Sequence, residues 1–218
     1  MTLGEKFCEI ARSVPGSAKT NFKQKTCPDQ CVGEIAKFGH DTSDFPRRGP
    51  AIQRESSPYV ILVMESPHTQ EFDGEPGPAK GSTGDQIRRH IAEILRELSP
   101  SPPSELILVN AIQYQCSLGV DTEVHRDEVF RRFWEKGGRR DFEERLTQVY
   151  NPGDLLLNCC TDGKPTKGLR KLVTAAIHDS LGMVPLHSGP HPCSWYSPRN
   201  RRSVRLVAPL VAHPSDKP

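Results

Sequence analysis

The sequence predicts an α/β protein of three layers, α/β/α, in which helices cover both faces of a short, central, four-stranded parallel sheet. Four short apolar runs recur along the chain without strict alternation of polar and apolar residues. This pattern is typical of strands that are buried on both faces. The segments between these runs carry apolar residues at helical spacing. Strands and helices that alternate in this way favour parallel pairing.

The strands are predicted from runs of Val, Ile and Leu that are too short for helices. They are Tyr59–Met64, Glu105–Asn110, Asp154–Asn158 and Met183–His187.

A helix is predicted after the first strand, because isoleucines and leucines between residues 87 and 98 fall on one face. Its start fits a capping box with either Ser82 or Thr83 as the N-cap. Pro100 follows as a stop.

Further helices are predicted between the later strands. Two stretches between residues 129 and 150 have helical periodicity, and Gly137–Gly138 separates them. Residues 169–181 form another amphipathic helix, with Thr166 as its expected N-cap and Gly182 as its left-handed stop.

The two ends of the chain have a different character. Residues 1–57 are predicted to be an extension packed on a core domain of residues 58–218, with weak helical pieces at Phe7–Arg12 and Cys31–Phe38. The segment from Pro198 to Pro218 is irregular and basic. Its arginines are Arg199, Arg201, Arg202 and Arg205.

Composition limits the functional classes. The net charge of the 218-residue chain is only +2, so a surface for nucleic acid must be local. The 20 prolines and 17 glycines indicate many connections, which places much of the chemistry on loops. No apolar run is long enough to span a bilayer, and Met1–Phe7 lacks the apolar core of a signal peptide. We therefore expect a cytoplasmic protein.

Polar side chains follow three of the predicted strands. Glu65 comes directly after the first strand, Asn110 ends the second, and His191 lies just beyond the fourth. The carboxyl ends of parallel strands meet at one edge, where ligands bind in such sheets. A carboxylate there can orient water or stabilise a cation, an amide can recognise a base, and an imidazole can stabilise a leaving anion.

At these positions the sequence resembles the uracil-DNA glycosylase superfamily. Met64-Glu-Ser-Pro-His68 is similar to the family's first motif, and Pro78-Ala-Lys-Gly-Ser-Thr-Gly84 to its Pro-Phe-Val-Gly-x-Ala-Gly segment. Val109-Asn110 is similar to the strand-end Asn motif, and His191-Pro-Cys-Ser-Trp195 to the His-Pro-Ser loop. The resemblance covers roughly residues 58–200 and implies the family's fold.

The resemblance implies that the protein flips a nucleotide out of the DNA stack and cuts its N-glycosidic bond without a metal. Glu65 would act on water or the sugar cation, Asn110 would hold the flipped base, and His191 would stabilise the departing base. Trp195 or Tyr196 would fill the vacated stack. The residues expected to contact phosphates beside this wedge are Ser194, Arg199, Arg201 and Arg202.

The departures from the family motif favour a particular substrate. Ala79 stands where the family has a Phe that stacks on uracil, so the pocket is expected to lose one wall. His68 replaces a Gly and adds a polar ring, which makes it a third expected catalytic residue. Ser66 and Ala79 join Asn110 as expected base-binding residues. These changes favour a bulky base, as in similar antiviral glycosylases that remove glucosylated hydroxymethylcytosine from phage DNA.

The expected partner is DNA, in particular phage DNA with modified bases, and the protein is expected to act as a monomer without a membrane. No cofactor is expected. Some branches of the family bind an iron–sulfur cluster through four cysteines, so a cluster or zinc at Cys27, Cys31 and Cys116 is the alternative. Cys159-Cys160 is expected to be buried and structural.

Other readings remain open. The site could belong to a uracil-DNA glycosylase of base excision repair, or to a silent reader that binds a modified base without cutting it. Gly74–Thr83 contains the residue types of a phosphate-binding loop, but Gly81 follows Lys80 where that motif requires Ser or Thr. The charged segment Glu123–Arg145 mixes both signs and is predicted to be a solvated helix face.

Overall fold

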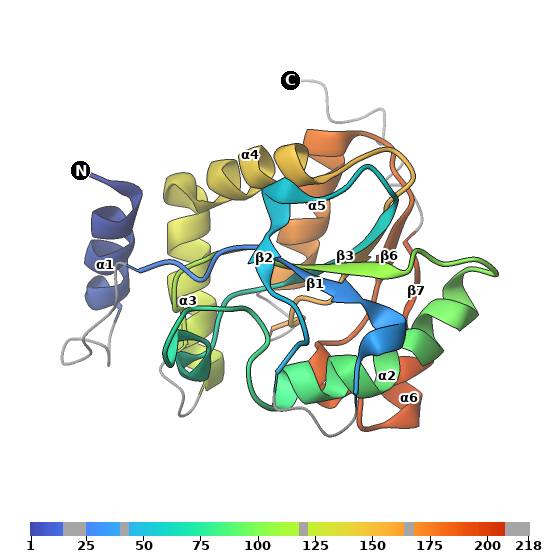
Figure 1. Cartoon of the computed structure of the whole chain (residues 1–218). Helices are drawn as coiled ribbons and strands as arrows, with labels where there is room; N and C mark the ends of the chain where they lie inside the picture. Colours follow the sequence, from blue (N-terminus) through green and yellow to red (C-terminus); the bar gives the residue numbers. More distant parts are fainter. Residues whose placement is uncertain (15–24, 40–43, 118–121, 164–167, 208–218) are drawn as a thin grey trace.

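The computed structural model describes residues 1–14, 25–39, 44–117, 122–163 and 168–207. Within these ranges a single, mostly parallel sheet carries helices on both faces (Figure 1). Its seven strands have the order β2-β1-β4-β3-β5-β6-β7. They are β1 (Gln30–Glu34), β2 (Gly49–Pro50), β3 (Tyr59–Met64), β4 (Glu105–Asn110), β5 (Leu155–Asn158), β6 (Leu186–Ser188) and β7 (Arg205–Leu206).

The α/β class is confirmed, but the expectation of a four-stranded sheet is wrong. The four predicted strands form the parallel centre, β4-β3-β5-β6. Three further strands extend it at the edges, each antiparallel to its neighbour in the sheet. The predicted helix Cys31–Phe38 is instead strand β1, followed by a single 3₁₀ turn, Ile35–Lys37. Pairing with β4 decides the structure of this short apolar run.

Two hydrophobic cores lie on the two faces of the sheet. The residues of β3 are all buried, and they alternate between the cores: Val60 and Leu62 contact the core under α2, whereas Ile61 and Val63 contact the other. Burial on both sides explains why the run shows no polar alternation.

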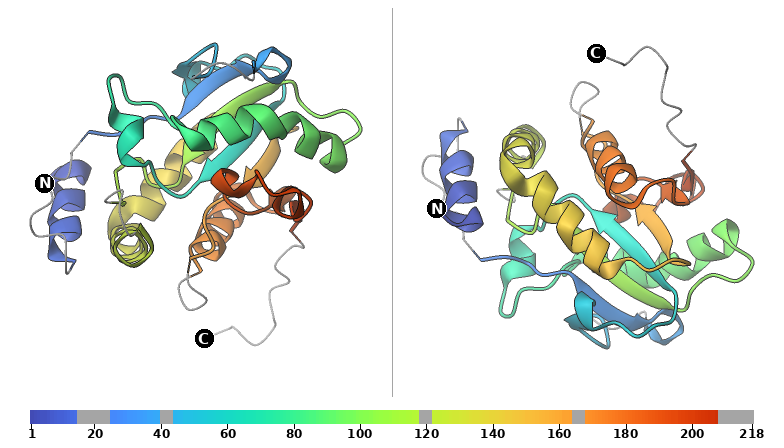
Figure 2. Two further views of the ribbon diagram at one scale, coloured as in Figure 1. Left: turned by 90° about the horizontal axis from the view of Figure 1, so that it is seen from below. Right: turned by 90° about the horizontal axis from the view of Figure 1, so that it is seen from above.

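The helices form the outer layers (Figures 1 and 2). They are α1 (Leu3–Ser13), α2 (Ser82–Leu98), α3 (Thr122–Phe133), α4 (Arg139–Val149), α5 (Leu169–Leu181) and α6 (Pro198–Arg201). Helix α2 covers one face, and the larger core beneath the other face includes residues of α1, α3, α4 and α5. The helix predicted around Phe7–Arg12 is thus confirmed as α1, and residues 1–57 contribute both to this core and to the sheet edge.

The ends of the helices only partly match the sequence prediction. Gly81, with φ of 75°, precedes α2 and no side chain caps it, so the predicted capping boxes at Ser82 and Thr83 are wrong. Helix α5 begins after Gly168, whereas Thr166 lies outside the described residues. Gly182 ends α5 with φ of 74°, and Gly137, with φ of 134°, breaks the path between α3 and α4 as predicted. Among the described helices, none is both long and apolar enough to cross a bilayer.

Candidate active site

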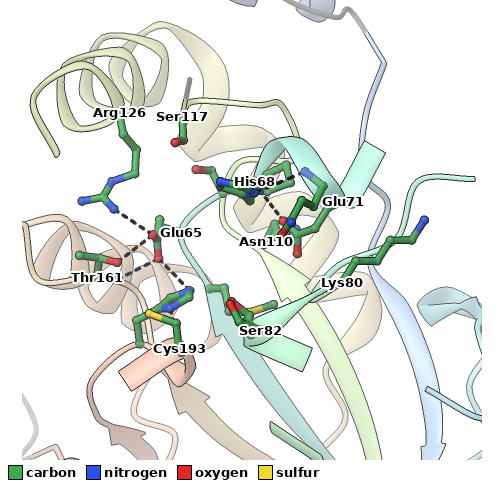
Figure 3. Close-up of a pocket in the computed structure, with 16 residues that line it drawn as sticks. Glu65, His68, Glu71, Lys80, Ser82, Asn110, Ser117, Arg126, Thr161 and Cys193 are labelled. Carbon is green, nitrogen blue, oxygen red and sulfur yellow. Dashed lines mark hydrogen bonds and ion pairs between the residues drawn. The ribbon is translucent and has the colours of Figure 1, made fainter. Parts of the chain in front are cut away.

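A pocket of about 220 Å³ opens at the carboxyl ends of β3 and β4 (Figure 3). The loops after β5 and β6 close its other side. Most of the residues that line it have polar side chains; the lining comprises Met64, Glu65, Ser66, Pro67, His68, Gln70, Glu71, Lys80, Ser82, Thr83, Asn110, Ser117, Arg126, Thr161, His191 and Cys193. Five residues expected in the site from the sequence are therefore together: Glu65, Ser66, His68, Asn110 and His191.

Glu65 is a buried carboxylate held from three directions. Thr161 donates to it twice, from the backbone N–H to Oε2 at 3.0 Å and from the hydroxyl to Oε1 at 2.7 Å. The guanidinium of Arg126 lies 3.5 Å from Oε1. The imidazole Nε2 of His191 lies 3.7 Å from Oε2. The last two contacts are long, so they provide charge without saturating the carboxylate oxygens.

These neighbours keep Glu65 ionised. Burial alone would raise its pKa, but the positive charges of His191 and Arg126 and the hydrogen bonds from Thr161 outweigh burial and lower the pKa. The pocket therefore holds an anion at the end of β3 that can stabilise a nearby cation or orient a water molecule.

His191 shows the complementary effect. Burial would lower the pKa of its ring, but the carboxylate of Glu65 raises the pKa to about 9. The backbone N–H of Cys193 donates to Nδ1 at 3.3 Å, a contact that only the neutral ring can make and that therefore opposes this shift. Nε2, which faces Glu65, carries a proton whether the ring is neutral or cationic.

Asn110 brings an unsatisfied amide to the same pocket. Its Nδ2 contacts Sγ of Cys27 at 3.8 Å, whereas its Oδ1 is buried and has no hydrogen-bond partner among the described residues. A buried acceptor of this kind is uncommon in folded proteins, and a ligand is one common explanation.

The loop that carries His68 is organised by a carboxyl group that the sequence analysis missed. Glu71 is buried in the pocket wall and accepts hydrogen bonds from the backbone N–H groups of His68 and Ala79. Burial raises its pKa to about 7. The side chain of His68 accepts from the N–H of Gln70 at 3.4 Å through Nδ1, which leaves Nε2 as the donor. A Glu after a short loop carries no distinctive sequence signal.

Ala79 does not line the pocket as expected. It is fully buried in the core under α2, and its φ of 56° places it in the left-handed region. The expectation that Ala79 removes a pocket wall is therefore wrong. The described lining nevertheless contains no Phe, Tyr or Trp side chain, and its only rings besides Pro67 are the imidazoles of His68 and His191.

The expected wedge residues separate in the structure. Trp195 is 0% exposed, and its indole N–H donates to the carbonyl of Pro190 at 3.0 Å, so its ring cannot fill the vacated stack and that alternative is wrong. Tyr196 is 72% exposed on the same loop. The sequence does not indicate which of the adjacent rings, Trp195 or Tyr196, is buried, because either ring could point into the core.

The expected phosphate contacts also differ in their surroundings. Arg201 is tied to the protein, with Nη1 donating to the carbonyl of Trp195 at 2.6 Å and Nε 3.0 Å from a carboxylate oxygen of Glu93. Arg199 and Arg202 are exposed. The hydroxyl of Ser194 donates to the carbonyl of His191 at 2.8 Å and so shapes the loop.

The charged segment Glu123–Arg145 is not simply a solvated face, as the mixed charges predicted. Arg126 and Asp127 are buried together, and both Nε and Nη2 of Arg126 contact Oδ1 of Asp127. Arg145 lies largely inside the protein. Mixed charge did not reveal the burial of Arg126 and Arg145, because the fold alone brings Arg126 near Glu65 and Arg145 near Asp29. Thr161, in the loop after β5, was likewise missed.

Lys80 does not form a phosphate-binding loop in this structure. Its Nζ donates to the carbonyl of Asp73 at 2.7 Å and to that of Glu75, so the ammonium is engaged by its own loop. The cysteines expected as alternative metal ligands, Cys27, Cys31 and Cys116, are buried thiols. In the described part of the chain, no group of three or more His, Cys, Asp or Glu side chains is arranged to hold a metal ion.

Comparisons of the chain with protein-family models, with curated proteins and with solved structures find no match. The residues of the pocket therefore provide the indication of function. A buried anion, a proton-carrying imidazole and a carboxamide whose oxygen has no partner in the described structure can together bind a polar planar group, stabilise positive charge beside it and donate a proton to it.

Proposed function

We propose that the protein is a monofunctional DNA glycosylase, which hydrolyses the N-glycosidic bond of an extrahelical modified pyrimidine and leaves an abasic site. One observation carries the proposal: the ionised Glu65, His191 and Asn110 line one pocket at the carboxyl edge of the sheet, and Oδ1 of Asn110 has no hydrogen-bond partner among the described residues. A flipped base requires a recessed polar site of this kind.

The proposed reaction divides among these three residues. The amide of Asn110 holds the base, which fixes the sugar near Glu65. The C1′–N bond breaks with its electron pair going to the base, and the carboxylate of Glu65 stabilises the positive charge left on the sugar. The Nε2–H of His191 stabilises the departing base. The oxygen of a water molecule then bonds to C1′, and a proton of that water neutralises the base.

The favoured substrate is glucosylated hydroxymethylcytosine of phage DNA, which gives the enzyme a role in antiviral defence. Two properties of the lining support a base with a hydroxyl-rich substituent. The described lining offers no Phe, Tyr or Trp ring on which a bare uracil could stack. It offers side-chain hydroxyl groups instead, from Ser66, Ser82, Thr83 and Ser117, which can bond to a sugar.

The loop after His191 provides the proposed contact with duplex DNA. Tyr196 projects from the loop that carries His191, so its ring can occupy the space that the flipped base leaves. The exposed Arg199 and Arg202 follow on the same segment and can contact phosphates. This local patch is compatible with a net charge of only +2.

The experiment that tests this function offers the protein three substrates: phage DNA with glucosylated hydroxymethylcytosine, a uracil-containing duplex and a uracil-containing single strand. Released base and alkali-labile sites are measured for each. The proposal predicts both products from the glucosylated DNA. Product from uracil DNA alone would assign the enzyme to uracil repair, and tight binding without product would make it a silent reader.

Borohydride added during turnover tests the monofunctional mechanism. A glycosylase that uses water forms no imine with its substrate, so no protein–DNA adduct is expected. A trapped adduct that disappears in a Lys80→Arg variant would instead assign lyase chemistry to Lys80.

A further inference from the structure

The backbone of Asn110 is held on both sides by one buried ion pair. Asp29, which precedes β1, accepts a hydrogen bond from the N–H of Asn110 through Oδ1 at 3.2 Å. Arg145 of α4 donates through Nη2 to the carbonyl of Asn110 at 3.1 Å and to that of Ala111 at 3.2 Å. The two charged groups also contact each other, with Nη1 of Arg145 2.5 Å from Oδ2 of Asp29.

The pair comes from elements that are distant in sequence and lies where β4 ends. Asp29 belongs to the segment before β1, and Arg145 comes from α4, on the face of the sheet opposite α2. Burial would lower the pKa of Arg145, but the carboxylates of Asp29 and Asp141 raise it, so the guanidinium stays charged. Charges placed inside a protein are costly unless they are paired and fully bonded. Arg145 Nε binds Asp141 on its own helix at 2.9 Å, and the other side-chain bonds of the pair go to the backbone of Asn110 and Ala111.

A buried thiol fixes the side chain of the same residue. Cys27 is anchored by its N–H, which donates to the carbonyl of Gln113 at 2.8 Å. Its Sγ lies 3.8 Å from Nδ2 of Asn110. Burial strongly raises the pKa of this thiol, so it remains protonated and neutral. With Nδ2 directed to sulfur, Oδ1 is the amide atom left without a partner in the described structure.

We propose that Asp29 and Arg145 are positioning residues that hold the Asn110 amide so that Oδ1 accepts a hydrogen bond from an N–H group of the bound base. The inference rests on the proposed glycosylase function and adds a requirement to it. The base must carry an N–H donor on its pairing edge, as the exocyclic amine of a cytosine does. The segment before β1 thereby acquires a role in base recognition.

Two duplexes test the requirement for a donor. Both carry glucosylated hydroxymethylcytosine on a 2′-fluorinated sugar that resists cleavage, and in one of them the exocyclic amine is dimethylated. The dissociation constants of the wild-type protein for the two duplexes are compared. We expect the wild-type protein to bind the dimethylated duplex roughly 10- to 100-fold more weakly, because Oδ1 then meets no donor.

The variant that tests positioning is Arg145→Lys, which keeps the charge but replaces a planar fork by a single ammonium. We expect it to lose most of the preference for the unmethylated amine, and to lower kcat/KM on the cleavable substrate by roughly 10- to 100-fold. Arg140→Lys is the matched control, because Arg140 forms an exposed ion pair with Glu144 on the same helix. Asp29→Asn provides a second variant that removes the other partner.

The outcomes separate the two proposals. If wild-type protein discriminates between the duplexes and folded Arg145→Lys and Asp29→Asn proteins discriminate equally well, the positioning role is overturned while the glycosylase function stands. If wild-type protein discriminates and the two variants do not, but wild-type protein releases no base, the positioning role stands and the glycosylase function fails. If wild-type protein prefers neither duplex, the donor requirement is wrong. Circular dichroism and thermal unfolding identify a variant that has not folded, in which case the remaining variant decides.

Discussion

Nε2 of His191 lies 3.7 Å from Oε2 of Glu65, and each side chain shifts the pKa of the other toward the charged form. Glu65 follows β3 and His191 follows β6, so the sheet edge brings the two groups together. Because the distance exceeds that of a hydrogen bond, Nε2–H stays available to a substrate. The pair therefore provides an anion for a sugar cation and a donor for a leaving base in adjacent positions.

Replacement of Glu65 by Gln should remove the anion from the pocket and, with it, the charge that raises the pKa of His191. We expect turnover to fall by about 10²–10⁴-fold. We also expect the pKa of His191 to fall from about 9, because its main stabilising charge is lost. Base release measures the first, and NMR of the ring nitrogens against pH measures the second. Glu97→Gln, at an exposed position on α2, is the control. An unchanged His191 pKa in Glu65→Gln would contradict the coupling.

The rate should depend on pH through Glu71 and His191. The pKa of Glu71 is about 7, and protonation removes an acceptor from the N–H groups of His68 and Ala79, so turnover should decrease as the pH falls through about 7. The pKa of His191 is about 9, so loss of the cationic ring should decrease turnover above that pH. A pH profile of kcat/KM measures both limbs. Glu71→Gln should abolish the lower limb, and its persistence would assign that limb to another group.

His191 should also make stability depend on pH. Its folded pKa of about 9 lies above the ordinary value of 6.5, so its contribution is fully present below about pH 6.5 and is lost as the pH rises through about 9. We expect His191→Gln to reduce the free energy of unfolding by about 1–3 kcal/mol at pH 6, and by much less at pH 10. Urea unfolding at the two pH values provides the comparison. An equal loss of unfolding free energy at both pH values would mean that the charge on His191 does not contribute to stability.

The two aromatic residues after Ser194 should behave oppositely on substitution. Trp195→Ala should reduce the free energy of unfolding by about 3–5 kcal/mol, because it empties a buried site. Tyr196→Ala should leave stability within about 0.5 kcal/mol. It should reduce base release from duplex DNA by about tenfold, with a smaller effect on single strands. Equal effects on the two DNA forms would remove Tyr196 from the wedge position.

The centre of the fold could be predicted from the sequence because its signal is local. Runs such as that of β3 are apolar throughout, and the helices between them have clear periodicity. The edge strands could not be predicted in this way. Strand β1 has apolar residues that also fit a helix, and β2 and β7 have only two residues each. Pairing with a neighbour, which no local pattern reveals, determines these strands.

The residues of the site also differ in whether the sequence could predict them. Glu65, Asn110 and His191 could be predicted because each stands at or beyond a recognisable strand end. Arg126 and Thr161 could not, because their role depends on distance to Glu65 in space. The sequence around an arginine in a mixed-charge helix does not indicate whether its guanidinium is buried or exposed.

The measurement that tests the central claim most directly is mass-spectrometric detection of free base. DNA that carries glucosylated hydroxymethylcytosine is incubated with wild-type protein and with Glu65→Gln, and released base is counted against abasic sites. We predict one released base for each abasic site with wild-type protein, and at least about 100-fold less with the variant. Binding without release by wild-type protein, or equal release by both proteins, would contradict the account.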